Sequence, residues 1–303
     1  MTKIECFKIQ VLKGENPFEL RKNEVVKRIF CEKESVFKEP KTILADPFLF
    51  VYKGILYLFY EDKEMNKNGV ISMIYTKDLK NWSEPIVVLK ENCHLSYPWV
   101  FEKNDHIYMI PETCGLKEIR LYEATSDLAT FKFVKTILHD DTDHNNGFSF
   151  SDSSIYEKDG FFYLMTSVND GQKNILKLFV SDRLDGEYKE HPQSPICVNN
   201  QYSRNAGCLF TYENKLYRVA QDCEKRYGDN VNLLEIKEMN SEEYQEVMVK
   251  SNIIPTDSAF YKEGGHQFNI VLYKNNYLVA TDAKEYHYFI LYRIMRKLKK
   301  MFR

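Results

Sequence analysis

The chain has 303 residues, of which 44% are hydrophobic and 28% charged, and its formal net charge is -2. This composition is that of a globular protein with a sizeable core, and it excludes a disordered or fibrous chain. The small negative charge argues against a nucleic-acid partner, because a general nucleic-acid binder needs a cationic face to release counterions from phosphates. The 21 tyrosines and 20 phenylalanines favour pleated strands over helices, so an all-β fold is expected.

The N-terminal segment has charged residues between its apolar ones and lacks the continuous apolar stretch of a signal peptide. The seven cysteines show no CxxC pair and no Cys/His metal spacing, so neither a disulfide framework nor a structural zinc site is indicated. The loop at 140–147 resembles a calcium loop only superficially, since the EF-hand spacing is absent. We therefore expect a cytoplasmic protein with no metal site.

One strand–turn–strand pattern recurs five times along the chain, at a spacing of roughly fifty residues. Each copy has a short apolar strand, a polar turn such as Lys53-Gly54 or Asn275-Asn276, and a second strand that reaches a tyrosine. A polar two-residue turn between two strands predicts a β-hairpin. The five copies span residues 46–57, 97–108, 152–163, 206–217 and 266–277.

Further strand-like runs follow the hairpins, for example at 69–75, 118–123 and 175–180. Four strands per repeat of this length are typical of a propeller blade. The fifth copy has too little chain after it for four strands, whereas residues 1–45 contain apolar runs and no copy of their own. We therefore predict a five-bladed β-propeller over residues 1–284, with residues 1–45 completing the last blade. Two stacked β-sandwiches are the alternative, which the even spacing of the tyrosines disfavours.

The repeat also predicts where a site lies. Charged and polar groups recur at the start of the first strands, where a core position would be apolar, so they are explained more easily as ligand contacts around a channel. A turn-capping role for Asp46 and a structural hydrogen-bonding role for His266 are the alternatives. The equivalent positions are Asp46, Tyr97, Asp152, Ala206 and His266, with Arg204 just before the fourth.

A second ring of polar residues is expected from the ends of the second strands. Five residues follow their tyrosines by four or five positions and should flank the same face: Glu61, Asp62, Glu112, Gln221 and Asp222. The planar fork of Arg204 could hold a sugar hydroxyl, a carboxylate or a phosphate there. The arginines of this region could instead serve in ion pairs with Asp222 or Glu224.

Several motifs resemble those of known propellers. Residues 45–47, 76–82 and 181–192 resemble motifs of the family 43 and family 32 glycoside hydrolases. Residues 96–102, 108–113, 204–207 and 217–228 are more similar to the N-terminal propeller domain of plant glucosamine inositolphosphorylceramide transferases and their bacterial relatives. The hydrolase resemblance implies a base Asp, a pKa-setting Asp and an acid Glu on the first three blades. Asp46 matches the first, but Tyr97 and Asp152 replace the others, which speaks against ordinary hydrolysis.

The tail at 285–303 differs in character from the rest. From Arg293 onward it has six Lys or Arg residues and no acid. At 3.6 residues per turn it forms a basic amphipathic helix, too short and too charged to span a bilayer. We expect residues 286–303 to bind an anionic membrane surface, the alternative being a helix packed on the propeller. The apolar face is formed by Leu291, Ile294, Met295, Leu298 and Phe302.

These features together predict a carbohydrate-active protein that is peripheral on the inner membrane face and transfers a glycosyl group in surface-polysaccharide or glycolipid assembly. The substrate is a sugar or glycan, lipid-linked or free, and no cofactor is expected beyond an activated sugar donor. Asp46 would be the base and Asp152 the second carboxylate. The predicted substrate-binding residues are Tyr97, Glu112, Arg204, Asp222 and His266. An inverting glycoside hydrolase and a non-catalytic glycan-binding module are the alternatives.

Overall fold

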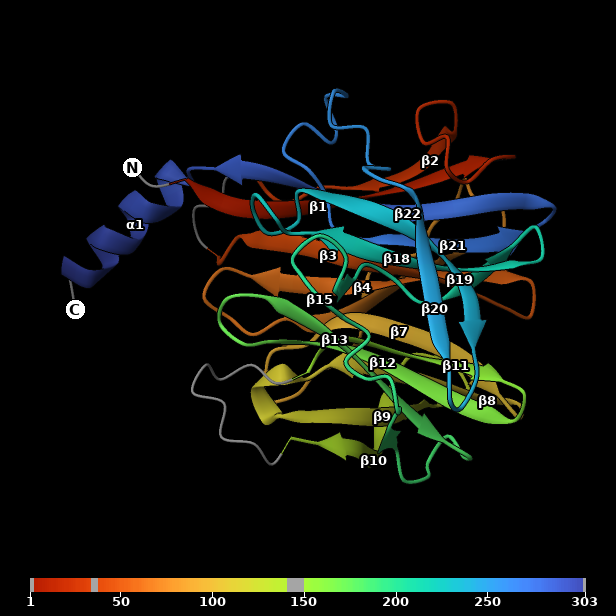
Figure 1. Ribbon diagram of the computed structural model, residues 1–303. Helices are drawn as coiled ribbons and strands as arrows, with labels where there is room; N and C mark the ends of the chain where they lie inside the picture. Colours follow the sequence, from red (N-terminus) through yellow and green to blue (C-terminus); the bar gives the residue numbers. More distant parts are fainter. Residues whose placement is uncertain (1–2, 34–37, 141–149, 302–303) are drawn as a thin grey trace.

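The computed structural model describes residues 3–33, 38–140 and 150–301. It is a five-bladed β-propeller with a short C-terminal helix, as the sequence predicts (Figure 1). Blade one contains β3 (Lys41–Tyr52), β4 (Ile55–Glu64), β5 (Val70–Thr76) and β6 (Ile86–Leu89). Blade two contains β7 (Ser96–Lys103), β8 (His106–Glu112), β9 (Glu118–Ala124) and β10 (Phe131–His139), with the short helix η1 (Cys114–Leu116).

The third and fourth blades follow the same antiparallel order, with short additional strands. Blade three contains β11 (Ser151–Lys158), β12 (Phe161–Asn169), β13 (Asn174–Ser181), β14 (Lys189–Glu190) and β15 (Cys197–Val198). Blade four contains β16 (Arg204–Asn205), β17 (Phe210–Tyr212), β18 (Lys215–Asp222), β19 (Asn230–Met239) and β20 (Tyr244–Lys250).

Blade five is built from both ends of the chain. It contains β21 (Phe268–Tyr273), β22 (Asn276–His287), β1 (Ile4–Gly14) and β2 (Glu24–Ile29). β1 pairs antiparallel with the whole of β22, from Ile4 opposite His287 to Gly14 opposite Tyr277. A parallel bridge between Phe7 and Ile43 then joins blade five to blade one. The strand β22 runs to His287, beyond the expected end of the propeller at 284, and residues 41–45 lie in β3 of blade one.

The hairpin turns explain why the repeats fold alike. Both central residues of each turn have positive φ, for example Asn104 (53°) and Asp105 (63°). This is the conformation of a two-residue turn that matches the twist of the flanking strands, and Asn, Asp and Gly adopt it readily. In the fifth hairpin the turn is Lys274-Asn275, one residue earlier than the sequence pattern indicates.

Aromatic and aliphatic side chains fill the spaces between blades. Phe48, Trp99 and Phe162, from blades one, two and three, belong to one buried cluster. The six cysteines whose side chains the structure describes are free thiols, and two of them, Cys6 and Cys31, lie in the core beside blade five. The strands therefore present apolar side chains between the blades, and polar side chains lie at the propeller axis and at its outer surface.

Blade four also contains a fully buried arginine. The side chain of Arg218 is 0% exposed and forms a two-pronged ion pair with Glu246, with Nε to Oε2 at 2.7 Å and Nη2 to Oε1 at 2.5 Å. Arg218 also donates to the Tyr202 carbonyl at 2.9 Å, and the Tyr244 hydroxyl donates to Glu246 at 2.6 Å. Arg218 is thus a structural residue of the blade.

The helix α1 (Ile290–Met301) follows β22 and projects beside the N-terminus (Figure 1). Phe289, with φ 48°, turns the chain between the strand and the helix. The ends of β22 and β4 and the starts of β1 and β3 lie at this end of the propeller, opposite the hairpin turns. We call it the α1 end.

Candidate functional site

The first strands of blades one, two and three share a bulge at the predicted site positions. Asp46, Tyr97 and Asp152 have φ values of 50°, 46° and 52°, a left-handed conformation that a tyrosine rarely adopts. At each bulge two residues of the first strand lie opposite one residue of the second, as where Ala45 pairs with Glu61 and Phe48 with Phe59. Such bulges redirect side chains and concentrate at functional sites.

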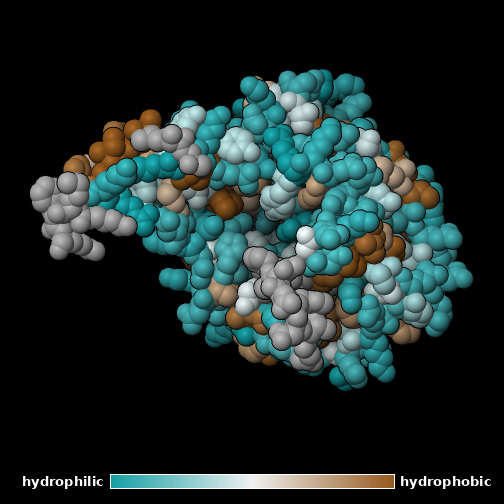
Figure 2. Space-filling model, turned by 60° about the vertical axis from the view of Figure 1, so that its left-hand side comes forward, coloured by the Kyte–Doolittle hydropathy of each residue, from teal (hydrophilic) through white to brown (hydrophobic). Residues whose placement is uncertain are grey.

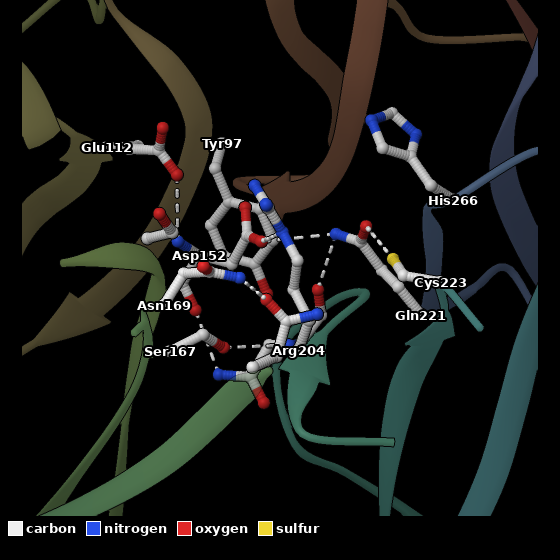
Figure 3. Close-up of polar contacts among 12 residues, drawn as sticks. Tyr97, Glu112, Asp152, Ser167, Asn169, Arg204, Gln221, Cys223 and His266 are labelled. Atoms are coloured by element: carbon white, nitrogen blue, oxygen red, sulfur yellow. Dashed lines mark hydrogen bonds and ion pairs between the residues drawn. The ribbon is translucent and has the colours of Figure 1, made fainter. Parts of the chain in front are cut away.

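Asp152 is held by a network that spans three blades (Figure 3). Arg204 donates from Nε to Asp152 Oδ2 at 2.6 Å, and Gln221 donates from Nε2 to the same oxygen at 3.1 Å. The Asp152 backbone N–H donates to Glu112 Oε2 at 3.0 Å, and Asn205 donates to the Asp152 carbonyl at 2.9 Å. Asp152, Glu112 and Arg204 therefore come together as predicted from the repeat.

His266 lies between two carboxylates on the other side of the site. Its Nδ1 is 2.6 Å from Asp282 Oδ2, and its Nε2 is 3.5 Å from Asp46 Oδ1. The backbone N–H of Asp46 donates to Asp282 Oδ2 at 3.2 Å, and that of Tyr97 donates to Asp46 Oδ2 at 3.0 Å. A Cβ on Gly265 would lie 2.3 Å from the Asp282 carbonyl oxygen, so this glycine lets the backbone approach the second strand.

Burial and neighbouring charges set the protonation of this cluster. Burial raises the pKa of Asp46 well above its usual range, with the charges of Glu61 and Asp152 adding to the effect. Burial also raises the pKa of Asp152 to about 6, although Arg204 opposes the shift. The buried Asp46 carboxyl group therefore holds a proton more readily than an exposed aspartate does.

The pKa of His266 is raised as well, so its imidazole ring carries a positive charge at neutral pH. Burial works against its charged form, but the charge and hydrogen bond of Asp282, together with the charge of Asp46, raise its pKa to about 9. The pKa of Asp282 is held below its usual value, because the His266 charge and hydrogen bonds outweigh its own burial. At neutral pH the pair is an ionised Asp282 and an imidazolium that faces Asp46.

This pairing predicts a pH dependence of stability. A histidine with a pKa of 6.5 in the unfolded chain and about 9 in the folded chain contributes fully below pH 6.5, and its contribution is lost as the pH rises through 9. We expect the free energy of unfolding to fall over this interval by on the order of 3 kcal/mol. In His266→Gln the fall should be absent. Urea unfolding of both proteins across this range measures it, and parallel curves would show that His266 does not hold its proton in the folded state.

A rim of one exposed tyrosine, Tyr227, and two largely buried cations, Arg204 and Lys284, borders the buried cluster. The Tyr227 side chain is 41% exposed; its ring lies 5.0 Å from the Arg204 guanidinium carbon and edge-on to His266 at 5.1 Å. Lys284 Nζ lies 5.6 Å from the same ring and donates to the Tyr227 carbonyl. An aromatic ring flanked by cations beside carboxylates suits a sugar ring and its hydroxyls, or a sugar carrying a phosphate.

Two of the predicted residues have roles other than the one expected. Asp222 lies away from the cluster and accepts a hydrogen bond from the Glu224 backbone at 3.0 Å, while its neighbour Gln221 points inward. The Tyr97 ring is fully buried against Phe48 at 4.8 Å, so it is not open to a substrate, and its backbone N–H donates to Asp46. Side chains alternate along a strand, so residues 221 and 222 cannot both face the site.

Three site residues were not predicted from the sequence: Tyr227, Asp282 and Lys284. Asp282 could have been found from the hairpin turn. In blade one, Glu61 lies seven residues after the second turn residue Gly54, and Asp282 lies seven after Asn275. Tyr277 follows its second turn residue, Asn275, by two positions, whereas Tyr57 follows Gly54 by three, so counting from the tyrosine misses Asp282 by one residue.

One group of side chains has the geometry of a metal site. Asp46, His266 and Asp282 each offer one ligand atom, and these atoms lie within 4.8 Å of one another. A bound cation would have to displace the proton of His266, whose pKa is raised by the same carboxylates. His266 and Asp282 already form an ion pair of opposite charges at 2.6 Å without a metal ion.

Residues 5–280 match the family described as "Glucosamine inositolphosphorylceramide transferase 1, N-terminal". The chain belongs to this family. It is 34% identical over 262 residues to glucosamine inositolphosphorylceramide transferase 1 of Oryza sativa subsp. japonica, covering 79% of this chain and 34% of the relative. It is 36% identical over 219 residues to the Arabidopsis thaliana protein of the same name, covering 69% and 28%. The chain thus spans about a third of the length of these relatives.

Solved structures share the fold of this family member. A thermostable family-43 glycoside hydrolase matches with a TM-score of 0.57 and 14% identity, over 81% of this chain and 90% of that one. A family 117 glycoside hydrolase from Zobellia galactanivorans matches with a TM-score of 0.55 and 11% identity, over 85% and 89%. At these identities the likeness shows the propeller fold alone.

Proposed function

We propose that this chain binds a sugar substrate at the buried cluster of Asp46, Asp152, Arg204, His266 and Asp282, which we call the axial cluster. In this proposal the chain takes part in glycosyl transfer, in the assembly of a surface polysaccharide or glycolipid at the cytoplasmic face of the membrane. The observation that carries the proposal is the position of the Asp46 carboxylate beside the His266–Asp282 pair, next to the tyrosine and cations of a rim suited to sugar. The transferase name of the longer relatives supports it.

In the proposed reaction, Asp46 accepts the proton of an acceptor hydroxyl. The hydroxyl oxygen then forms a bond to the anomeric carbon of an activated sugar, and the bond from that carbon to the donor phosphate breaks. The imidazolium of His266 and the guanidinium of Arg204 offset negative charge during the reaction, and Asp152 hydrogen-bonds a sugar hydroxyl.

The environment of Asp152 disfavours hydrolysis by an acid and base pair. An inverting hydrolase needs a carboxylic acid that protonates the leaving oxygen across a suitable gap. Asp152 instead accepts hydrogen bonds from Arg204 and Gln221 on one oxygen, and the Arg204 charge favours its ionised form against the effect of burial. Asp222 lies away from the cluster, so it does not take the place of that acid.

A glycan-binding module without turnover is the second candidate. It is favoured by the occupancy of the cluster, because Asp46 is only 5% exposed and both of its oxygens face partners within the protein. In this case Tyr227 and Arg204 would contact the sugar. The carboxylates of the axial cluster would only fix the positions of Arg204 and His266.

A transfer assay separates these functions. The full chain is incubated with a panel of nucleotide sugars and with lipid-linked and free sugar acceptors, and the released nucleotide and glycosylated product are measured by mass spectrometry. Acceptor-dependent nucleotide release supports transfer. Release of the aryl group from aryl glycosides without a donor would instead establish hydrolysis, and sugar binding without either reaction would establish a binding module.

A further inference from the structure

The helix α1 is fixed to the propeller by one side. Phe289 and Tyr292 are buried in the cluster that joins blades five and one. The Tyr292 hydroxyl donates to Glu39 Oε2 at 2.5 Å, and Asn66 donates to the same glutamate oxygen at 3.0 Å. These contacts set which side of the helix faces away from the protein.

The apolar side of α1 is exposed. Ile294 and Leu298, four residues apart and therefore on one side of the helix, are 44% and 40% exposed, and Leu291 beside them is 51% exposed. Figure 2 shows apolar surface along the outer edge of the projecting helix. An amphipathic helix that only covered a soluble protein would turn this side toward the core. We call Leu291, Ile294 and Leu298 the outer stripe.

Cations accompany the outer stripe. Arg293 and Lys297, four residues apart, follow one edge of it, and residues 286–303 contain no acid. Between α1 and the propeller lies a cleft of about 580 Å³, which Arg293, Ile294 and Lys297 help to line. Ile294 is therefore the member of the outer stripe that borders the cleft, and its side chain is still 44% exposed. A strip of apolar surface with cations along its edge complements lipid tails and anionic headgroups.

We propose that α1 lies in the interface of an anionic membrane, with the outer stripe immersed among lipid tails and Arg293 and Lys297 on headgroup phosphates. The charge favours this partner over a second copy of the chain, because two such helices would bring like charges together. Within the described residues no helix has the length and apolar character needed to cross a bilayer.

The placement of α1 also determines how the propeller meets the membrane. Asp46, Asp152 and Arg204 lie toward the starts of their strands, and Gln221 toward the end of its strand, which is the α1 end of the propeller. An anchor at this end brings the axial cluster toward the lipid surface. The inference rests on α1 and does not require the chain to transfer sugars.

The proposal is tested by sedimentation of the full chain with vesicles of phosphatidylcholine alone or mixed with phosphatidylglycerol. The wild type should sediment with the mixed vesicles and should bind them less as salt is added. A double variant, Ile294→Glu with Leu298→Glu, should weaken binding by roughly tenfold to a hundredfold for each lost side chain. Replacing Arg293 and Lys297 with glutamine should weaken it by roughly thirtyfold in total.

A matched control keeps the same chemical change away from the helix. Val247 and Val249 are exposed on β20, an outer strand of blade four, and replacing both with glutamate adds the same charge. This control should bind vesicles as the wild type does. Absence of wild-type binding, or equal binding by the Ile294→Glu, Leu298→Glu variant, would overturn the proposal. Self-association of the wild type without vesicle binding would assign the stripe to a second copy instead.

Discussion

Replacing Asp46 with asparagine is expected to lower turnover by about a hundredfold to ten-thousandfold, the usual contribution of a general base. This corresponds to about 3 to 5 kcal/mol of activation free energy. Asparagine tolerates the left-handed φ of 50° at this position, and its carbonyl oxygen can still accept the Tyr97 N–H. The proton-accepting oxygen beside His266 is lost, so the fold should persist while the reaction slows. The transfer assay described above measures it.

The matched control for this variant is Asp222→Asn, which changes a nearby carboxylate outside the cluster. It should retain wild-type turnover. If Asp46→Asn stays active and loses only about 1 kcal/mol of stability, as expected for one lost local hydrogen bond, Asp46 is a structural cap. The base would then be sought at Asp152 or Glu112.

The largest stability effect is expected from Arg218→Met. Methionine fills similar space but leaves the Glu246 carboxylate buried without its two-pronged partner, and removal of one member of a buried ion pair costs about 3 to 5 kcal/mol. The free energy of unfolding in urea, measured by circular dichroism, should fall by this amount. The Tyr202 carbonyl also loses a donor, which adds to the cost.

Two comparisons make the Arg218 result specific. Arg226→Met removes an arginine whose ion pairs with Asp229 and Glu263 are partly exposed, and it should cost less than about 1 kcal/mol. Replacing Glu246 with leucine in the Arg218→Met protein should restore much of the lost stability, because the unpaired buried charge is gone. A loss no greater in Arg218→Met than in Arg226→Met would contradict the buried-pair account.

The fold was predictable because strand alternation, turn residues and terminal tyrosines repeat together. The closure of blade five followed from counting strands, since the fifth hairpin lacks partners and the N-terminal residues lack a repeat. The fifth turn was misplaced by one residue because Lys274 occupies a left-handed position that is more often filled by Asn, Asp or Gly. That slip also concealed Asp282.

The site was predictable only in part. Asp46, Asp152 and His266 share one position in the repeat. Arg204 lies just before that position and Glu112 near the end of a second strand, and the structure places all five together. The bulges were not predictable, because a tyrosine with positive φ leaves no signal in the sequence, and without them the direction of the Tyr97 ring cannot be known. Their chemical roles stay predictions.

The most direct test of the central claim, that a sugar binds at the axial cluster, is saturation-transfer NMR of mono- and oligosaccharides with the full chain. We predict saturation transfer to at least one sugar in the wild type. In Tyr227→Ala binding should be roughly tenfold weaker, a loss of about 1.4 kcal/mol, whereas Tyr75→Ala, an exposed tyrosine of blade one, should leave it unchanged. Absence of transfer to any sugar, or equal transfer in Tyr227→Ala, would contradict the assignment of the cluster as a carbohydrate site.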